Sequence, residues 1–154
     1  MSQNDVLHLE VNFSDWRGNR GAGLTGIDLF LYYSLDNLLK PFNLSDEEIK
    51  YGIIDQGNDG GVDALYLFAN HNTLIRDDID LKAAGTSRIH IVIVQVKSSL
   101  SETGFKLDDI RKFQSFSDDL LDLGTPASSY KHKYHDALIT LINTFKDKYL
   151  VDNP

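Results

Sequence analysis

Residues 88–97, RIHIVIVQVK, show the clearest strand pattern in the sequence and decide its fold. Both faces of this strand are apolar, with isoleucines on one and valines on the other: Ile89, Ile91, Ile93, Val92, Val94 and Val96. Side chains alternate between the two faces of a strand, so an apolar set on each face predicts cover on both. We therefore expect this strand to be central in a sheet and packed between helices.

A second strand is predicted at residues 62–69, VDALYLFA, directly after the acidic, glycine-rich turn GNDGG at 57–61. Alternation puts the odd-numbered positions on one face, so Asp63 lies in line with Leu65 and Leu67. The two glycines that end the turn would allow a tight entry into the strand, close enough for a metal ion and a phosphate to approach.

Gln95 and Lys97 continue the isoleucine face of strand 88–97, so both strands carry polar groups at one end of one face. Unpaired buried charges are costly, and these groups therefore need partners. One interpretation is a partly exposed strand end where Lys97 pairs with Asp63. The other is a hard-cation site, in which oxygens of Asp63, Gln95 and the Val96 backbone carbonyl bind Mg²⁺ or Mn²⁺. Lys97 would then orient water and stabilise a phosphate, which makes Asp63, Gln95 and Lys97 the catalytic candidates for phosphodiester hydrolysis.

Helical patterns surround the two strands. They comprise an apolar segment, a short segment with a capping box, and two amphipathic segments, at residues 24–40, 45–52, 106–124 and 128–150. The pattern at 6–13, VLHLEVNF, is compatible with either a strand or a helical turn. This order predicts an α/β or α+β protein with one central sheet flanked by helices.

The composition bounds the class of protein. With 154 residues, of which 42% are hydrophobic and 25% charged, the chain suits a single globular domain over residues 1–154. The absence of Cys excludes disulfides and thiol chemistry and fits a reducing cytoplasm. No apolar run approaches the roughly 20 residues that span a bilayer, and residues 1–13 lack the basic region of a secretory signal, so we expect a cytoplasmic protein without membrane contact. The net charge of −8 by itself argues against binding to nucleic acid.

Asp28 lies within the apolar segment at 24–40, on a helical surface shared with Leu24 and Leu31. It admits two interpretations. It is either an acid in the first turn of a helix, favoured there by the helix dipole, or a side chain that points at the polar cluster of Asp63 and joins the metal site.

The arrangement of Asp63 opening one strand and Gln95-Val96-Lys97 closing the next resembles the PD-(D/E)xK superfamily of restriction-like nucleases, in its Q-x-K form. The patterns GIDLFLYYSLDNLL, LSDEEIKYGIIDQGNDGG and DGGVDALYLFAN…IHIVIVQVKSS are similar to the N-terminal domain of abortive infection phage-resistance (AIPR-type) proteins, over about residues 20–120. The resemblance implies a restriction-endonuclease-like fold with a mixed central sheet flanked by helices. It also implies Mg²⁺-dependent endonuclease activity on DNA and a role in antiphage defence.

On this resemblance, Asp63, Gln95 and Lys97 occupy the catalytic positions, and Asp28 stands where many relatives place a helical Glu. Two departures follow. Gln95 in place of an acid predicts weaker metal binding, and the shorter Asp28 makes a water bridge the alternative to direct coordination. Members of this family are longer proteins. We therefore expect either an excised nuclease domain, with further domains or partner subunits, or a small stand-alone relative.

Basic residues follow the Q-x-K strand on the next helical segment. Lys106, Arg111 and Lys112 are candidates for contact with DNA phosphates, with a solvated charged face as the alternative. Apolar helix stripes would permit a homodimer. If Asp63 and Lys97 form only a structural ion pair, the chain would instead be a non-catalytic nuclease-fold module that binds nucleic acid or a protein partner. An unrelated α/β domain with a chance Q-x-K is the third interpretation.

Overall fold

The computed structural model describes residues 3–24, 28–54, 60–76, 88–97 and 106–152. Within these ranges the chain is an α/β protein with five α-helices and a small three-stranded antiparallel sheet, which confirms the predicted α/β class. The elements, with η for 3₁₀ helices, are α1 (Gln3–Asn19), η1 (Gly21–Gly23), α2 (Leu29–Leu38), η2 (Lys40–Phe42), α3 (Asp46–Tyr51), β1 (Ala64–Ala69), β2 (Thr73–Leu74), β3 (Ile89–Val94), α4 (Leu107–Leu121), η3 (Ala127–Tyr130) and α5 (Asp136–Asp152). None of the helices in these ranges combines the length and the apolar character needed to cross a membrane.

The sheet has the strand order β2-β1-β3, and both pairings are antiparallel. The central strand is β1, all of whose residues are buried and which also forms an antiparallel bridge from Ala64 to Ile53. β3 lies at the edge of the described sheet and is mostly half-buried. The prediction that 88–97 is the central strand is therefore wrong, and the strands described do not form the expected mixed sheet. Apolar residues on both faces indicate helices above and below a strand, but they do not reveal which strand has neighbours on both edges.

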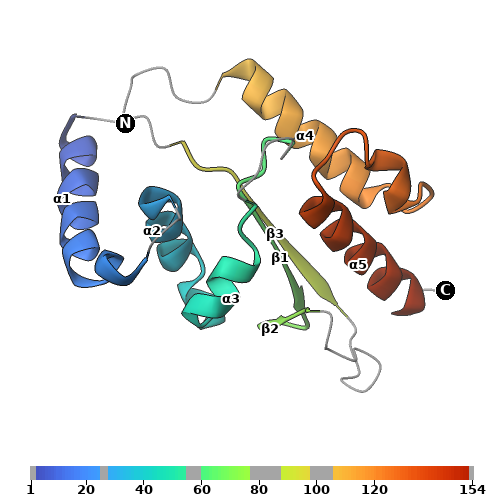
Figure 1. Ribbon diagram of the computed structural model, residues 1–154, viewed down its shortest axis with the longest axis horizontal. Coiled ribbons are helices and arrows are strands. Elements are labelled where there is room, and N and C mark those ends of the chain that lie inside the picture. Colours follow the sequence, from blue (N-terminus) through green and yellow to red (C-terminus); the bar gives the residue numbers. More distant parts are fainter. Residues whose placement is uncertain (1–2, 25–27, 55–59, 77–87, 98–105, 153–154) are drawn as a thin grey trace.

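One face of the sheet packs against α4 and α5. Leu65 lies opposite Ile93 in the antiparallel register, and Leu67 lies opposite Ile91, so the odd-numbered positions of both strands share this face as predicted. The helices contribute large buried side chains to the same core: Phe116, Leu120, Leu138 and Ile142. Figure 1 shows the two helices together on this side of the strands.

The opposite face packs against α2 and α3, which lie across the sheet from α4 and α5 in Figure 1. Tyr66 and Phe68 of β1 are almost completely buried there. The helices contribute Tyr32, Leu35, Leu39 and Ile49 to this second core. A strand that serves two separate cores explains why residues 64–69 contain no charged side chain.

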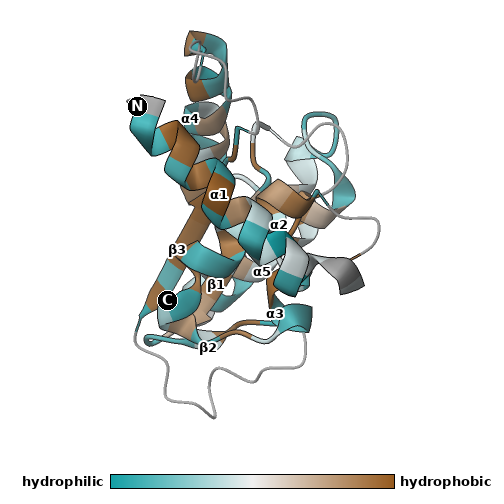
Figure 2. Ribbon diagram, turned by 90° about the vertical axis from the view of Figure 1, so that its left-hand side faces the viewer, coloured by the Kyte–Doolittle hydropathy of each residue, from teal (hydrophilic) through white to brown (hydrophobic). Residues whose placement is uncertain are grey.

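The N-terminal segment, for which the sequence left strand and helix open, is the helix α1, seen in front in Figure 2. Its C-terminal half packs on α2, with the Phe13 and Phe30 ring centroids 5.3 Å apart. Trp16 Nε1 and Arg20 both donate hydrogen bonds to the Asp36 carboxylate, at 2.9 and 2.8 Å. Aromatic packing and a shared carboxylate therefore attach α1 to the helical layer on this face.

Polar contacts fix α4 against the segment that leads into α5. Tyr134 Oη donates to the Asp119 carboxylate at 2.6 Å, and the Lys133 ammonium binds the same carboxylate. Lys146 is only 5% exposed and donates to the Thr125 carbonyl at 2.7 Å, and burial lowers its pKa. These contacts help to hold α4 in place, and the first turn of this helix lies beside the end of β3 at the candidate site.

Replacing Gly52 by Ala is expected to destabilise the protein by about 1–3 kcal/mol, because an added Cβ would lie 2.3 Å from Cε1 of the buried Tyr66 ring. That ring is held in place by its hydroxyl, which donates to the Ile49 carbonyl at 2.6 Å. Urea unfolding of Gly52→Ala and wild type measures the effect. Gly18→Ala is the control, because a Cβ there meets nothing within 4 Å, and Ala in a helix is neutral or stabilising by up to about 1 kcal/mol. Equal stability of Gly52→Ala and wild type would contradict this packing.

Candidate active site

Two glycines with positive φ form the turn that enters β1, Gly60 at 64° and Gly61 at 79°. Residues with a Cβ rarely adopt this conformation. Space is also short, because a Cβ on Gly60 would lie 2.7 Å from Cε1 of Tyr134. A Cβ on Gly61 would lie 3.3 Å from both Nε2 of Gln95 and Cβ of Lys112. The tight entry predicted from the sequence is thus present, and the groups beside it are the Tyr134, Gln95 and Lys112 side chains and the Phe113 backbone.

Asp63 follows this turn and joins β1 to its neighbours on both edges. Its N–H donates to the Val94 carbonyl at 2.9 Å, and its carbonyl accepts from the Ile54 N–H at 2.9 Å. Its Oδ2 accepts a hydrogen bond from the Val96 N–H at 2.5 Å. The carboxylate therefore continues the pairing of the two strands just past the last residue of β3. This contact joins the Asp63 carboxylate to the Q-V-K segment through the backbone of Val96, while the convergence of the Asp63, Gln95 and Lys97 side chains stays a prediction.

The side chains of Gln95 and Lys97 have different surroundings, although the two residues flank Val96. Gln95 lies beside the Gly61 turn and lines an open groove with residues of α4. Lys97 is 37% exposed, and its Nζ lies 3.2 Å from Oδ1 of Asp109 in the first turn of α4. Asp109 is a carboxylate of this site that was not predicted from the sequence.

Asp109 also caps α4, because its Oδ2 accepts from the Lys106 N–H at 3.0 Å. This backbone hydrogen bond, followed by the Lys97 ammonium, lowers the pKa of Asp109 below the usual range for Asp. Asp109 therefore stays ionised in mildly acidic solution and couples Lys97 to the start of the helix. An acid in the first turn of a helix, such as Asp109, is a signal visible in the sequence, whereas the contact with Lys97 arises only when the two segments meet in space.

Asp28 is the N-cap of α2. Its Oδ1 accepts from the Phe30 N–H at 2.8 Å and from the Leu31 N–H at 3.1 Å. These bonds satisfy two of the amides that a helix leaves unpaired at its start. The geometry supports the interpretation of Asp28 as an acid at a helix terminus, while a role in metal binding stays a prediction.

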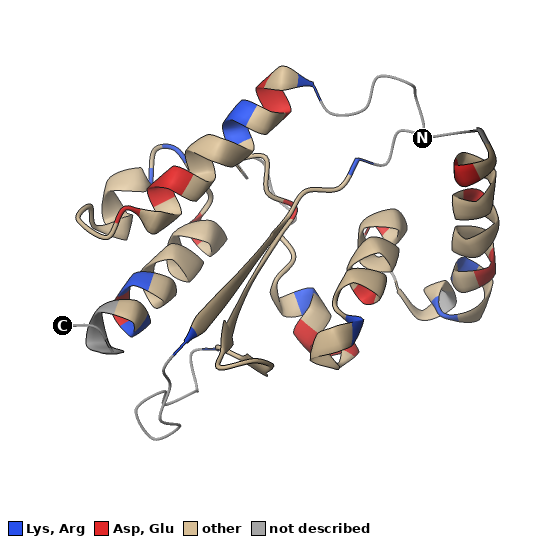
Figure 3. Cartoon of the chain, turned by 180° about the vertical axis from the view of Figure 1, so that it is seen from behind, with Lys and Arg blue, Asp and Glu red and all other residues tan. Residues whose placement is uncertain are grey.

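The predicted phosphate-binding residues lie at the N-terminal end of α4, a helix along which basic and acidic residues alternate (Figure 3). Lys106 is exposed and precedes the first turn, and Lys112 is exposed with its Cβ near Gly61. Arg111 is 68% exposed and lies 3.7 Å from the Asp108 carboxylate. The basic residues are accessible to a polyanion, although acidic neighbours reduce the local positive charge.

The donor atoms that would hold the expected Mg²⁺ or Mn²⁺ are the Asp63 carboxylate, the Gln95 amide oxygen and the Val96 carbonyl. All are hard oxygen ligands, which suits these ions. Within the described ranges, however, no group of three His, Asp or Glu side chains is arranged to hold a metal ion. An ion held by so few protein oxygens would have to keep water ligands and bind together with a substrate phosphate, as Mg²⁺ commonly does.

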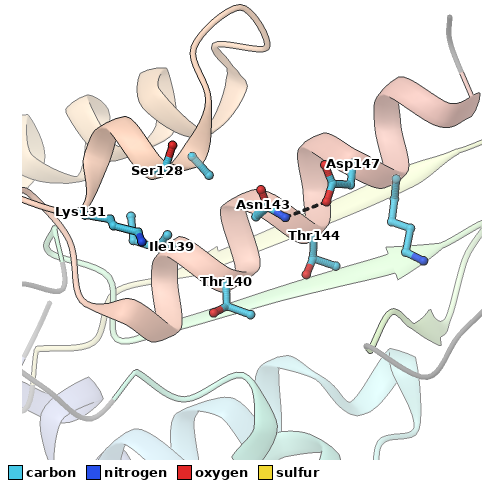
Figure 4. Close-up of a pocket in the computed structure, with 9 residues that line it drawn as sticks. Ser128, Lys131, Ile139, Thr140, Asn143, Thr144 and Asp147 are labelled. Carbon is cyan, nitrogen blue, oxygen red and sulfur yellow. Dashed lines mark hydrogen bonds between the residues drawn. The ribbon is translucent and has the colours of Figure 1, made fainter.

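A larger cavity, of about 630 Å³, lies between η3 and α5 (Figure 4). Most of its lining residues are of polar type, namely Ser128, Lys131, Thr140, Asn143, Thr144, Asp147 and Lys148, and the others are Ala127 and Ile139. Asn143 Nδ2 donates to Asp147 Oδ2 at 2.6 Å across one turn of α5. None of the predicted catalytic residues lines this cavity. The end of the sheet is distinguished by its polar contacts, from Asp63 to Val96 and from Lys97 to Asp109, and not by the size of a cavity.

The end of the sheet thus combines a carboxylate, an amide, a lysine and a helix-capping carboxylate. Comparisons of the chain with protein-family models, with curated proteins and with solved structures found no match.

Replacing Asp63 by Ala is expected to lower the free energy of unfolding by about 1–3 kcal/mol, because the Val96 N–H loses its acceptor in a partly buried position. Asp63→Asn is the matched variant, since its amide oxygen can still accept this bond, and we expect a smaller loss. Urea unfolding of both variants and wild type provides the measurement. Equal losses in the two variants would show that this hydrogen bond is not what the carboxylate contributes to stability.

In Lys97→Met, the pKa of Asp109 is expected to rise towards the usual Asp value, because the ammonium that favours the ionised form is gone. Recovery should be partial, since the larger cause, the Lys106 backbone hydrogen bond, remains. Because the pKa of Asp109 is lower in the folded than in the unfolded protein, its ionisation stabilises the fold at pH values above the pKa of an unfolded Asp, about 3.9. This stabilisation is lost as the pH falls through the pKa of Asp109 in the folded protein. Carboxyl-carbon NMR titration measures the shift, with Arg111→Met, whose partner is Asp108, as the control. An unchanged Asp109 pKa in Lys97→Met would contradict the pairing.

Proposed function

We propose that this chain is a metal-dependent nuclease domain that hydrolyses phosphodiester bonds in DNA. The observation that carries the proposal is the hydrogen bond from the Val96 N–H to the Asp63 carboxylate, which joins the start of β1 to the Q-V-K end of β3. A carboxylate, an amide and a lysine at one end of a sheet are a suitable set for metal-assisted phosphoryl chemistry. The restriction-endonuclease-like fold and a role in antiphage defence belong to the same proposal, and they rest on the resemblance of the D-G-G-V-D and Q-V-K motifs.

The proposed roles follow from the chemistry of each group. A bound Mg²⁺ or Mn²⁺ would polarise the scissile phosphate and acidify a water molecule. Asp63 and Gln95 offer side-chain oxygens for the ion, and Val96 offers its carbonyl. Lys97 supplies a positive charge for the phosphate. Its contact with Asp109 is partly exposed, and such ion pairs are weak, so an incoming phosphate can displace the carboxylate.

Contact with DNA would extend from this site along the first half of α4. Lys106, Arg111 and Lys112 are exposed there and would meet backbone phosphates. Because the chain as a whole carries a charge of −8, binding would depend on these local cations and on a metal ion, and it should weaken steeply with salt. This arrangement favours contact with phosphates over recognition of base sequence.

A second candidate function is a non-catalytic module of the same fold that binds nucleic acid or a protein partner. Two observations favour it. The Lys97 ammonium already has a carboxylate partner in Asp109, and the described residues contain no cluster of acids ready for a metal ion. In this case the Asp63 carboxylate would serve only to close the end of the sheet.

Cleavage of plasmid DNA and of single-stranded DNA and RNA, with Mg²⁺ or Mn²⁺, separates the two candidates. The wild-type chain is expected to cleave DNA, and a chelator should abolish the activity. Asp63→Asn and Lys97→Met should each lose about 100-fold or more, because the groups they remove act on the reacting phosphate. Lys50→Met, which removes an exposed lysine of α3, is the matched control and should keep wild-type activity.

Equal cleavage by wild type, Asp63→Asn and Lys97→Met would refute the catalytic assignment. If the folded wild-type chain cleaves no substrate, fluorescence anisotropy measures whether it binds DNA. Binding that Lys112→Met weakens, without any cleavage by the folded wild-type chain, would instead support the non-catalytic module.

A further inference from the structure

One edge of β3 faces away from the rest of the described sheet. In β1, the Leu65 N–H donates to the Gly52 carbonyl at 2.9 Å, and the Leu67 carbonyl accepts from the Ile75 N–H at 2.8 Å. The backbone groups of these odd-numbered residues therefore point away from β3, and those of the even-numbered residues point towards it. In the antiparallel register, the even-numbered residues of β1 lie opposite even-numbered residues of β3: Ala64 opposite Val94, Tyr66 opposite Val92 and Phe68 opposite His90.

It follows that the N–H and C=O groups of Ile89, Ile91 and Ile93 point outwards. No strand in the described part of the chain pairs with this edge. Edge strands in soluble proteins are usually protected by a charge, a proline or very short length. Residues 89–96 contain no Lys, Arg, Asp, Glu or Pro. An apolar edge of this kind is suited to receive another β-strand.

An open, mostly apolar groove of about 370 Å³ lies at the same edge. It is lined by the strand and by the helices on both faces of the sheet: Leu38, Ile93, Val94, Gln95, Ile110 and Phe113. Leu38 of α2 is 51% exposed and Ile110 of α4 is 53% exposed, which is high for large apolar side chains. In Figure 2, β3 runs along one side of the molecule as a largely apolar ribbon. A strand added at this edge would lie between the two helices and cover both side chains.

We propose that this edge pairs with the same edge of a second copy of the chain, in a two-fold symmetric dimer. Two-fold pairing requires a surface that is complementary to itself. In an antiparallel alignment with Ile91 on the axis, Ile89 lies opposite the partner's Ile93, and such pairs of β-branched residues are favourable. The dimer joins the two three-stranded sheets into one continuous antiparallel sheet.

The distribution of charge favours a second copy of the chain as the partner at this edge. Each chain carries a net charge of −8, and two copies would repel each other at most surfaces. Residues 89–96 form a strip without Lys, Arg, Asp or Glu, where two copies can meet without opposing like charges. A strongly charged peptide would find no counter-charge along this strip. The dimer does not depend on the proposed nuclease activity.

Sedimentation equilibrium of the whole chain over a wide range of concentrations tests the dimer. Wild type is expected to show a monomer–dimer equilibrium. Ile110→Glu should weaken dimerisation by roughly tenfold or more, because its carboxylate would be buried without a partner in the interface. Leu121→Glu is the matched control, since Leu121 lies on the same helix, is 59% exposed and is not among the groove residues.

Amide hydrogen exchange locates the interface directly. The outward amides of Ile91 and Ile93 should exchange more slowly as the concentration rises, whereas those of Val92 and Val94, which face β1, should be slow throughout. Monomers at every concentration, or a dimer that Ile110→Glu does not weaken, would overturn the proposal. Outward amides that are already protected in the monomer would also overturn it, because another part of the same chain would then cover the edge.

Discussion

The central strand β1 has to satisfy its backbone on two edges and bury its side chains on two faces, and the rest of the structure depends on this requirement. A buried N–H or C=O without a partner is costly, so β1 needs hydrogen bonds to β3 on one edge and to Gly52 and Ile75 on the other. Its apolar faces need cover, which α2 and α3 provide on one side and α4 and α5 on the other. The two helical layers are held in place relative to each other because both pack against β1.

The candidate site arises where this pairing ends. At the start of β1 the Asp63 carboxylate becomes the acceptor for the Val96 N–H, so a charged group sits at the end of two strands because the backbone there still needs a partner. The glycine turn allows α4 to pack against the same end, and the first turn of α4 brings Asp109 to Lys97. The hydrogen bond from the Val96 N–H to Asp63 thus contributes to the stability of the sheet, and the same carboxylate takes part in the chemistry proposed for the site. Variants that keep this hydrogen bond but remove the charge can separate the two contributions.

Much of the fold could be predicted because it is local. The alternation in residues 62–69 and 88–97 correctly paired the leucine and isoleucine faces, and Ser45 and Glu48 form the capping box expected of their spacing. The position of β3 at the edge of the described sheet could not be predicted, because a strand covered on both faces has the same apolar pattern whether or not it has neighbours on both edges. Asp28 was ambiguous for a related reason, because a cap and an inward-pointing acid differ only in where the helix begins.

The sequence by itself determined the α/β class and the faces of the two strands, because periodicity and turn chemistry act between near neighbours. Only the tertiary structure decided that β1 is the central strand, that Asp28 caps α2 and that Asp109 is a partner of Lys97. The position of β1 and the Asp109–Lys97 pair depend on which segments far apart in the chain meet, whereas the Asp28 cap depends on where α2 begins. Periodicity reports that a residue is covered, whereas the identity of the group that covers it is fixed by packing.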